Sequence, residues 1–365
     1  MKIGVLSTAV YRNPPLKYGG TELVAYNQVK ALYKNHEVTL ITVNETPDIG
    51  GVNIIRCGSE GKITELDMYN KYKNKLNEFD ILLDNSFEAY PYIFKKENPN
   101  SKVKIFHFFH SGIPFASNPP IPKDELHYVA VSKWYASLLQ DLYGVHVDYL
   151  YNGIDTSLYN PYKIDKKNYF LFISILLPDK GILRAIELFK EFHKEHKDYE
   201  LVIAGAKVDR PEFDNFNKLL TKEIVENADF IKYRGEVSFD EKVKLLQEAR
   251  ALVLPLSYTR PEYFGLVYIE ALASGTPVIT IPYGSAYELS GIDYYSRGFN
   301  KTAFLLPITD EEFQTSFHSV TTYTSKEYNE CILYANAFNL DEYKRKLEYL
   351  ITNDIDSYVR KYKIH

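Results

Sequence analysis

The chain has 365 residues, 45% of them hydrophobic, and a formal net charge of −5. This length exceeds that of one small domain and fits two domains of ordinary size, each able to bury its own core. The slightly acidic balance argues against nucleic acid as a partner, because such proteins present a strongly basic surface.

Cysteine content and the first residues bear on the compartment. Cys57 and Cys331 lie in different halves of the chain, which favours a reducing compartment over a disulfide framework. No zinc-ligand spacing is present. Residues 1–7 are typical of a buried strand that runs directly into a polar loop, so neither a signal peptide nor a membrane span is predicted. We therefore expect a cytoplasmic protein.

Strands and helices are predicted to alternate along the chain, a pattern typical of parallel sheets covered on both faces. A charged segment, 159–168, separates two runs of this alternation and predicts a linker. Residues after about 325 are predicted to be helical. The first run has predicted strands at 2–7, 37–43, 81–83, 103–108, 128–131 and 149–151, with helices at 21–34 and after Ser132; the second has strands at 169–175, 200–204, 230–234, 251–255 and 277–281.

Two carboxylates around a predicted helix start are the most informative feature. Glu262 precedes Gly265, and the run Leu266–Ala273 consists of good helix formers that end before Gly275. The free N–H groups at such a helix start suit a phosphate, and carboxylates accept hydrogen bonds from hydroxyl groups. A nucleotide sugar offers both. The alternative is a solvated helix face with two unrelated glutamates, but the flanking sequence is apolar on both sides.

Family resemblance extends this interpretation over nearly the whole chain. The segment from Glu262 to Glu270 resembles the E-x7-E signature of the retaining glycosyltransferases of family 4, also called glycosyltransferase group 1. Six further segments resemble family motifs in the family's order: Tyr18-Gly19-Gly20-Thr21-Glu22-Leu23-Val24, Asn35-His36-Glu37-Val38-Thr39-Leu40, Val131-Ser132, Asn152-Gly153-Ile154-Asp155, Pro178-Asp179-Lys180-Gly181 and Ala204-Gly205.

The resemblance implies an α/β fold of the GT-B architecture. Two facing Rossmann-like domains with parallel sheets are expected, with a C-terminal helix that crosses back to the first domain. The implied boundaries are an acceptor-binding domain over 1–158, a nucleotide-sugar-binding domain over 159–350 and the returning helix in 351–365.

Residue roles follow from the same resemblance. Lys180 is implied to bind the donor's phosphates, Glu262 its sugar and Glu270 its ribose hydroxyls. Backbone contacts to the donor are implied for Phe264, Gly265 and Leu266, and a phosphate contact for the loop at Gly19 and Gly20. His110 follows a predicted strand, where α/β sheets place ligands, and is implied to contact the transferred sugar or its phosphate. His107, inside that strand, is expected to be a packed residue.

One position departs from the family. Where its members usually have Gly-Arg before the phosphate-binding lysine, this chain has Ser174-Ile175. Loss of a guanidinium removes a charge-assisted contact worth about 1.5–3 kcal/mol. Arg184, Arg260 and Arg12 are the candidates for a compensating cation.

The expected activity is retaining transfer of a sugar from a UDP- or GDP-sugar to an acceptor hydroxyl, without a metal or another cofactor, in glycan, glycolipid or glycoconjugate synthesis. The acceptor is a saccharide, a lipid-linked molecule or a small molecule, and peripheral membrane contact is left open. Two alternatives remain: a non-catalytic nucleotide-sugar binder, and a GT-B epimerase or phosphorylase. A Rossmann dehydrogenase is disfavoured because no G-x-G-x-x-G follows the first strand.

Overall fold

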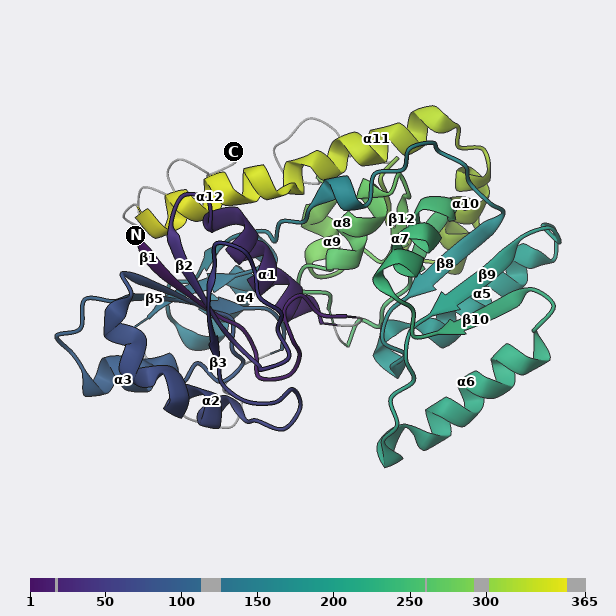
Figure 1. Cartoon of the computed structure of the whole chain (residues 1–365). Helices are drawn as coiled ribbons and strands as arrows, with labels where there is room; N and C mark the ends of the chain where they lie inside the picture. The colour runs from purple at the N-terminus through teal and green to yellow at the C-terminus, as the bar shows by residue number, and fades with distance from the viewer. Residues whose placement is uncertain (17–18, 113–125, 260, 292–301, 353–365) are drawn as a thin grey trace. The chain divides into compact units, whose positions relative to one another are not determined.

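The computed structural model describes residues 1–16, 19–112, 126–259, 261–291 and 302–352 (Figure 1). Its internal contacts divide the chain into two compact units. Unit 1 combines Met1–Ile154 with the segment that begins at Phe338, and unit 2 is Asp155–Ala337. The sequence placed these boundaries after residues 158 and 350. The first boundary therefore lies four residues earlier than expected. Tyr159, expected in a linker, is 2% exposed and hydrogen-bonds to Glu270 of unit 2.

Unit 1 is built on a parallel sheet. Its described strands follow the order β3-β2-β1-β4-β5-β6-β7, and neighbouring strands in this order pair in parallel. The strands are short apolar runs, as expected of a sheet buried on both faces. Their bounds are β1 Lys2–Leu6, β2 Glu37–Thr42, β3 Asn53–Arg56, β4 Ile81–Asp84, β5 Lys104–Phe109, β6 His127–Ala130 and β7 Asp148–Tyr149.

The last described helix returns to this unit. Residues of α12 (Leu340–Thr352) pack on α1 (Gly20–Leu32), and Tyr343, Leu347 and Leu350 belong to the same buried cluster as Ile3. The expected return of the C-terminal helix is therefore confirmed, although it begins earlier than 351. The rest of the predicted helix, 353–362, lies outside the described residues. The remaining helices of unit 1 are α2 Glu65–Tyr72, α3 Pro91–Glu97 and α4 Lys133–Tyr143, with a 3₁₀ helix at Lys73–Glu78.

Unit 2 repeats this design with a second parallel sheet. Its described strands follow the order β10-β9-β8-β11-β12-β13. The central strand β8 is buried at every position. Its Phe170 lies 5.3 Å from Phe192 and 4.8 Å from Phe317 between ring centroids. The strand bounds are β8 Tyr169–Ile173, β9 Glu200–Ala204, β10 Ile231–Gly235, β11 Ala251–Leu254, β12 Val278–Thr280 and β13 Phe304–Leu305.

The helices of unit 2 connect these strands and continue beyond the last one. Their bounds are α5 Ile182–His193, α6 Asp214–Glu226, α7 Phe239–Glu248, α8 Leu266–Ala273, α9 Ser285–Leu289, α10 Asp310–Thr321 and α11 Ser325–Ala335, with 3₁₀ helices at Thr156–Leu158, Pro178–Lys180, Pro211–Phe213 and Asn336–Phe338. Within the described ranges, no helix is both long and apolar enough to cross a membrane. The predicted fold class, two Rossmann-like units with parallel sheets, is confirmed.

Candidate functional site

Both sheets change direction beside their first strand. In unit 1 the order reverses between β1 and β4, and in unit 2 between β8 and β11. Loops leave the sheet to opposite sides at such a point, and ligands of open α/β sheets bind at the carboxyl ends of the strands there. The loops that follow β8 and β11 carry most of the predicted donor-binding residues.

Lys180 and Glu262 meet at this point of unit 2. The Lys180 ammonium lies 2.8 Å from Glu262 Oε2, and both side chains are about four-fifths buried, with exposures of 18% and 20%. Gly181 makes the approach possible, because a Cβ there would lie 2.0 Å from the carbonyl oxygen of Pro255. Its φ of 77° also favours glycine. The structure thus joins two residues that the sequence assigned to one ligand.

Gly265 shapes the start of α8. Its φ is 75°, and a Cβ there would lie 2.6 Å from the ring of Tyr268 and 2.9 Å from Cγ of Glu262. Leu266 begins the helix as predicted, and Phe264 is buried. The N-cap residue is Gly265 itself, which has no side chain to accept a hydrogen bond from the first turn. The Tyr268 N–H donates to the Gly265 carbonyl at 2.9 Å, and a helix start of this kind suits an anion, as the sequence suggested.

A second glycine, Gly284, lets the loop before α9 pack against the backbone of Glu262. The backbone N–H of Ser285 donates to the carbonyl of Glu262 at 2.9 Å. Gly284 has a φ of 64°, and a Cβ there would lie 2.5 Å from that same carbonyl oxygen. The loop before α9 therefore fixes the backbone that presents the Glu262 carboxylate.

Glu270 has partners that the sequence did not indicate. Its Oε1 accepts hydrogen bonds from the Tyr159 hydroxyl and the Lys242 ammonium, each at 2.7 Å, and the carboxylate is 4% exposed. Burial and the neighbouring carboxylate raise the pKa of Tyr159, so it remains a donor at neutral pH. The Lys242 ammonium also lies 5.3 Å from the centre of the Phe239 ring. This network holds Glu270 by one oxygen.

The family's phosphate-binding arginine is Ile175 in this chain, and three other arginines were candidates to replace its charge. The one candidate that the structure describes in unit 2, Arg184, is already paired. Arg184 forms a salt bridge with Asp310 at the start of α10. Arg260 lies outside the described residues. Arg12 belongs to unit 1, where its backbone N–H donates to Glu60 and its Nε is buried without a hydrogen-bond partner. Ile175 itself is half-buried.

In unit 1, the predicted glycine loop opens α1. Gly19 has a φ of 151°, and a Cβ there would lie 2.7 Å from Cβ of Pro15 and 3.1 Å from the Glu22 carboxylate. Gly20 is the first residue of the helix and is exposed. Glu22 accepts a short hydrogen bond from the Thr8 hydroxyl, and burial raises its pKa. An anion that approaches this helix start therefore also approaches a buried acidic group.

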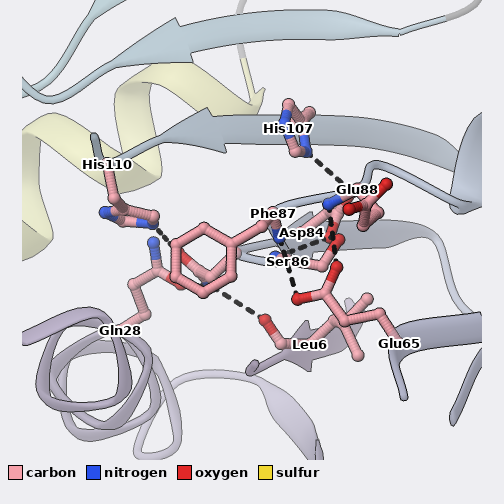
Figure 2. Close-up of polar contacts among 10 residues, drawn as sticks. Leu6, Gln28, Glu65, Asp84, Ser86, Phe87, Glu88, His107 and His110 are labelled. Carbon is pink, nitrogen blue, oxygen red and sulfur yellow. Dashed lines mark hydrogen bonds and ion pairs between the residues drawn. The ribbon is translucent and has the colours of Figure 1, made fainter. Parts of the chain in front are cut away.

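His110 is oriented by the amide side chain of Asn85, which is itself held by Gln28 and Leu6 (Figure 2). Asn85 donates to Gln28 Oε1 at 2.8 Å and to the carbonyl of Leu6 at 3.1 Å, so its own oxygen faces His110 Nε2 at 2.9 Å. That nitrogen must carry the proton, which makes Nδ1 the acceptor of the ring. Burial lowers the pKa of His110 to about 3, so the imidazole is neutral at pH 7.

His107 is packed, as expected. It is 1% exposed, and its Nδ1 lies 2.8 Å from Asp84 Oδ2 at the end of β4. The other oxygen of Asp84 accepts from the hydroxyl and backbone N–H of Ser86. Glu65 then fixes the same loop, because its oxygens accept the backbone N–H groups of Phe87 and Glu88 at 2.9 and 2.8 Å (Figure 2). Burial raises the pKa of Glu65 to about 7.

The sequence analysis did not identify the residues that orient Glu270 and His110. Tyr159 and Lys242 come from a presumed linker and from a polar helix, and neither position carried a signal. Asn85 was within reach, because it follows the buried strand β4 at its carboxyl end, where ligand-binding side chains gather. No hydrogen bond joins Glu262 to Glu270 among the described residues, and each carboxylate has its own lysine partner.

Comparison with known proteins finds a family match inside the second unit. Residues 158–299 match the family described as glycosyl transferases group 1. The putative glycosyltransferase YtcC of Bacillus subtilis is 22% identical over 344 residues, 81% of this chain and 80% of its own length. The O-antigen chain mannosyltransferase RfbU of Salmonella typhimurium is 32% identical over 158 residues. The chain spans less than half the length of some of its curated relatives, RfbU among them at 41%.

Solved structures agree on the fold. HepE of Anabaena in complex with UDP is 16% identical, with a TM-score of 0.73 over 96% of this chain and 100% of that one. At this identity the likeness establishes the fold alone. Residues 158–299 are therefore a glycosyltransferase group 1 domain, the kind found in enzymes that transfer glycosyl groups, within a chain of GT-B fold.

Proposed function

We propose that this protein transfers a sugar from a nucleoside-diphosphate donor to an acceptor hydroxyl, with retention of anomeric configuration and without a metal. Unit 2 binds the donor and unit 1 binds the acceptor. The observation that carries the proposal is the contact between Lys180 and Glu262 beside Gly265 at the start of α8. UDP bound to HepE supports a uridine nucleotide as the donor's leaving group.

Charge stabilisation at the leaving group follows from this geometry. Glycosyl transfer develops negative charge on the departing diphosphate and an oxocarbenium-like sugar. The Lys180 ammonium and the N–H groups at the start of α8 supply positive charge where the diphosphate leaves, a role that a metal ion plays elsewhere. Because Glu262 is paired with Lys180, the bound phosphate shares that ammonium with the carboxylate.

Glu262 is assigned to orienting the sugar. A covalent nucleophile needs a free carboxylate aligned with the anomeric carbon, whereas Glu262 is held by Lys180 and by its supported backbone. Its acceptor oxygens suit the sugar hydroxyls. Attack by the acceptor hydroxyl on the face that the diphosphate leaves then accounts for retention without a glycosyl-enzyme.

Glu270 is assigned to the ribose. Tyr159 and Lys242 occupy Oε1, which leaves Oε2 to accept from the ribose hydroxyls. In unit 1, the neutral His110 accepts a hydroxyl hydrogen bond through Nδ1, since Asn85 holds its other nitrogen. A neutral acceptor fits a sugar hydroxyl better than it fits a phosphate.

The test is donor hydrolysis and transfer by purified protein. A panel of UDP-, GDP- and ADP-sugars is incubated in EDTA, and the released nucleoside diphosphate is measured by mass spectrometry. Lys180→Met and Glu262→Gln are the test variants. Lys222→Met is the control, because its exposed ion pair with Glu226 lies on α6. Loss of the Lys180 contact should lower turnover about 10- to 150-fold, the equivalent of about 1.5–3 kcal/mol.

Ile175 favours one competing function. A protein that binds the nucleotide without turnover needs the Glu270 network for the ribose and can lack the family's arginine. This chain has both features, because Glu270 is held by Tyr159 and position 175 is isoleucine. Calorimetric binding of UDP with no release from any donor or acceptor would support that binder and refute the transferase. Release that stops in EDTA and returns with Mg²⁺ would refute the metal-independent mechanism alone.

A further inference from the structure

Two histidines and a glutamate meet at the far end of α5 in unit 2. Glu195 and His196 follow the helix, and His318 lies on α10. One ligand atom from each side chain lies within 4.8 Å of the other two. His318 Nε2 is 3.5 Å from Glu195 Oε2. Two ligands of a tetrahedral zinc ion, at their usual bond lengths, stand about 3.4 Å apart, so the cluster is close to a coordinating geometry.

The tautomer of His318 suits a metal. Its Nδ1 lies 2.8 Å from the backbone carbonyl oxygen of Gln314. A carbonyl only accepts hydrogen bonds, so Nδ1 carries the proton and Nε2 directs a lone pair at the cluster. Metal-binding histidines commonly donate their other N–H to a carbonyl or carboxylate in this way, which orients the ring and raises the basicity of the ligand nitrogen.

The His196 ring and the backbone that carries Glu195 are also held in place. The His196 ring stacks on Phe192, with centroids 4.2 Å apart and an interplanar angle of 9°, and it meets the His318 ring edge to face at 4.8 Å. Backbone N–H groups of Glu195 and His196 both donate to the carbonyl of Phe192. Phe192 also packs on Phe170 in the aromatic core of unit 2, so the two histidines lie at the edge of that core.

We propose that Glu195, His196 and His318 bind one divalent transition-metal ion of the zinc class. Imidazole with a carboxylate suits Zn²⁺, Ni²⁺ or Cu²⁺, whereas Mg²⁺ and Ca²⁺ require mostly oxygen ligands. The ion joins the end of α5 to α10. Its place is remote from Lys180, because α5 begins beside that residue and its 12 residues span about 18 Å. The ion therefore acts on the stability of unit 2 and takes no part in transfer.

Cysteines do not compete for this ion. Cys57 and Cys331 are buried, and burial raises their thiol pKa values to about 11 and about 12. With these pKa values both thiols remain protonated at neutral pH, whereas metals bind the thiolate form. Neither sulfur belongs to the cluster of Glu195, His196 and His318.

The experiment is calorimetric titration of full-length, tag-free, metal-stripped protein with Zn²⁺ and Ni²⁺, and with Mg²⁺ for comparison. The variants are His318→Ala, His196→Ala and Glu195→Gln. The control is His146→Ala, an exposed histidine that is also beside a carboxylate, Asp148. Wild type should bind one Zn²⁺ per chain. Each histidine substitution should weaken binding by at least the roughly 10- to 100-fold that loss of an outer partner costs a metal site.

A second measurement separates binding from misfolding. Zn²⁺ should raise the melting temperature of wild type and of His146→Ala, and should leave that of His318→Ala unchanged. Weak or absent Zn²⁺ binding by wild type overturns the proposal, as does binding that survives both histidine substitutions. Binding that depends on the histidines and is unaffected by Glu195→Gln overturns Glu195 as the third ligand.

Discussion

Lys242 offers the sharpest test of how the donor's ribose is held. It is 21% exposed at the side chain and donates to Glu270 Oε1 at 2.7 Å. Lys242→Met keeps the length of the side chain and its contact with the Phe239 ring, while it removes the ammonium. Glu270 then keeps the Tyr159 hydroxyl as its one direct partner of this network.

The size of the effect follows from burial. Removing one partner of a fully buried ion pair costs about 3–5 kcal/mol. Solvent reaches part of Lys242, and Tyr159 still satisfies the carboxylate. We therefore expect a loss of unfolding free energy of about 1–3 kcal/mol, the range for a buried polar group that loses its partner. Urea denaturation of Lys242→Met measures it, with Lys222→Met on α6 as the exposed control.

Ribose recognition is measured by a double-perturbation cycle. UDP and 2′-deoxy-UDP are titrated calorimetrically into wild type and Lys242→Met. If Lys242 orients Glu270 toward the ribose, the variant should lose affinity for UDP and lose much less for the deoxynucleotide, with a coupling energy of about 0.5–3 kcal/mol. Tyr159→Phe should show the same larger loss of affinity for UDP than for 2′-deoxy-UDP. Equal losses for the two nucleotides would refute the assignment of Glu270 to the ribose, even if the variant is destabilised.

Three further predictions concern backbone strain and pH. Gly265→Ala should destabilise the protein by at least about 1–2 kcal/mol in urea denaturation, because its φ is 75° and the new Cβ would lie 2.6 Å from the Tyr268 ring; Gly50→Ala, with open space around it, should not. His110 has a lowered folded pKa of about 3, so the unfolded chain binds more protons and the His110 contribution to stability falls as pH drops from about 6.5 toward 3; His110→Asn should lose this dependence in denaturation at pH 5 and 7. Glu65 has a raised folded pKa of about 7, so its contribution to stability is fully present below the ordinary glutamate pKa of 4.5 and is lost as pH rises through 7; an unchanged pH dependence in Glu65→Gln would contradict this.

Much of the fold was predictable because short stretches of sequence specify its strands and helices. Strands such as β4 and β8 are apolar runs buried at every position, and Leu266–Ala273 was placed correctly from helix formers bounded by glycines. Gly275, expected to end that helix, has a φ of 70°. Such signals depend on a few neighbouring residues, and each sheet then buries its strands on both faces.

The boundary at which the chain returns from unit 2 to unit 1 could not be predicted from such local patterns. Helical periodicity runs through α11 and α12 alike, so nothing local marks the change of unit at Phe338. That change is decided by which core accepts the apolar face of α12, and its Leu347 and Leu350 are buried beside Ile3. A contact between residues at opposite ends of the chain has no local sequence signal.

The sequence by itself determined the two α/β units and the helix start that Glu262, Gly265 and Glu270 define. Tertiary structure decided which charges meet. Lys180 reaches Glu262 because Gly181 lets two loops touch, Arg184 is held by Asp310, and Glu270 takes its partners from a segment and a helix that looked unrelated. Hydrophobic periodicity specifies local elements, whereas a buried charge is paired by whatever donor the packed sheet brings within hydrogen-bond distance.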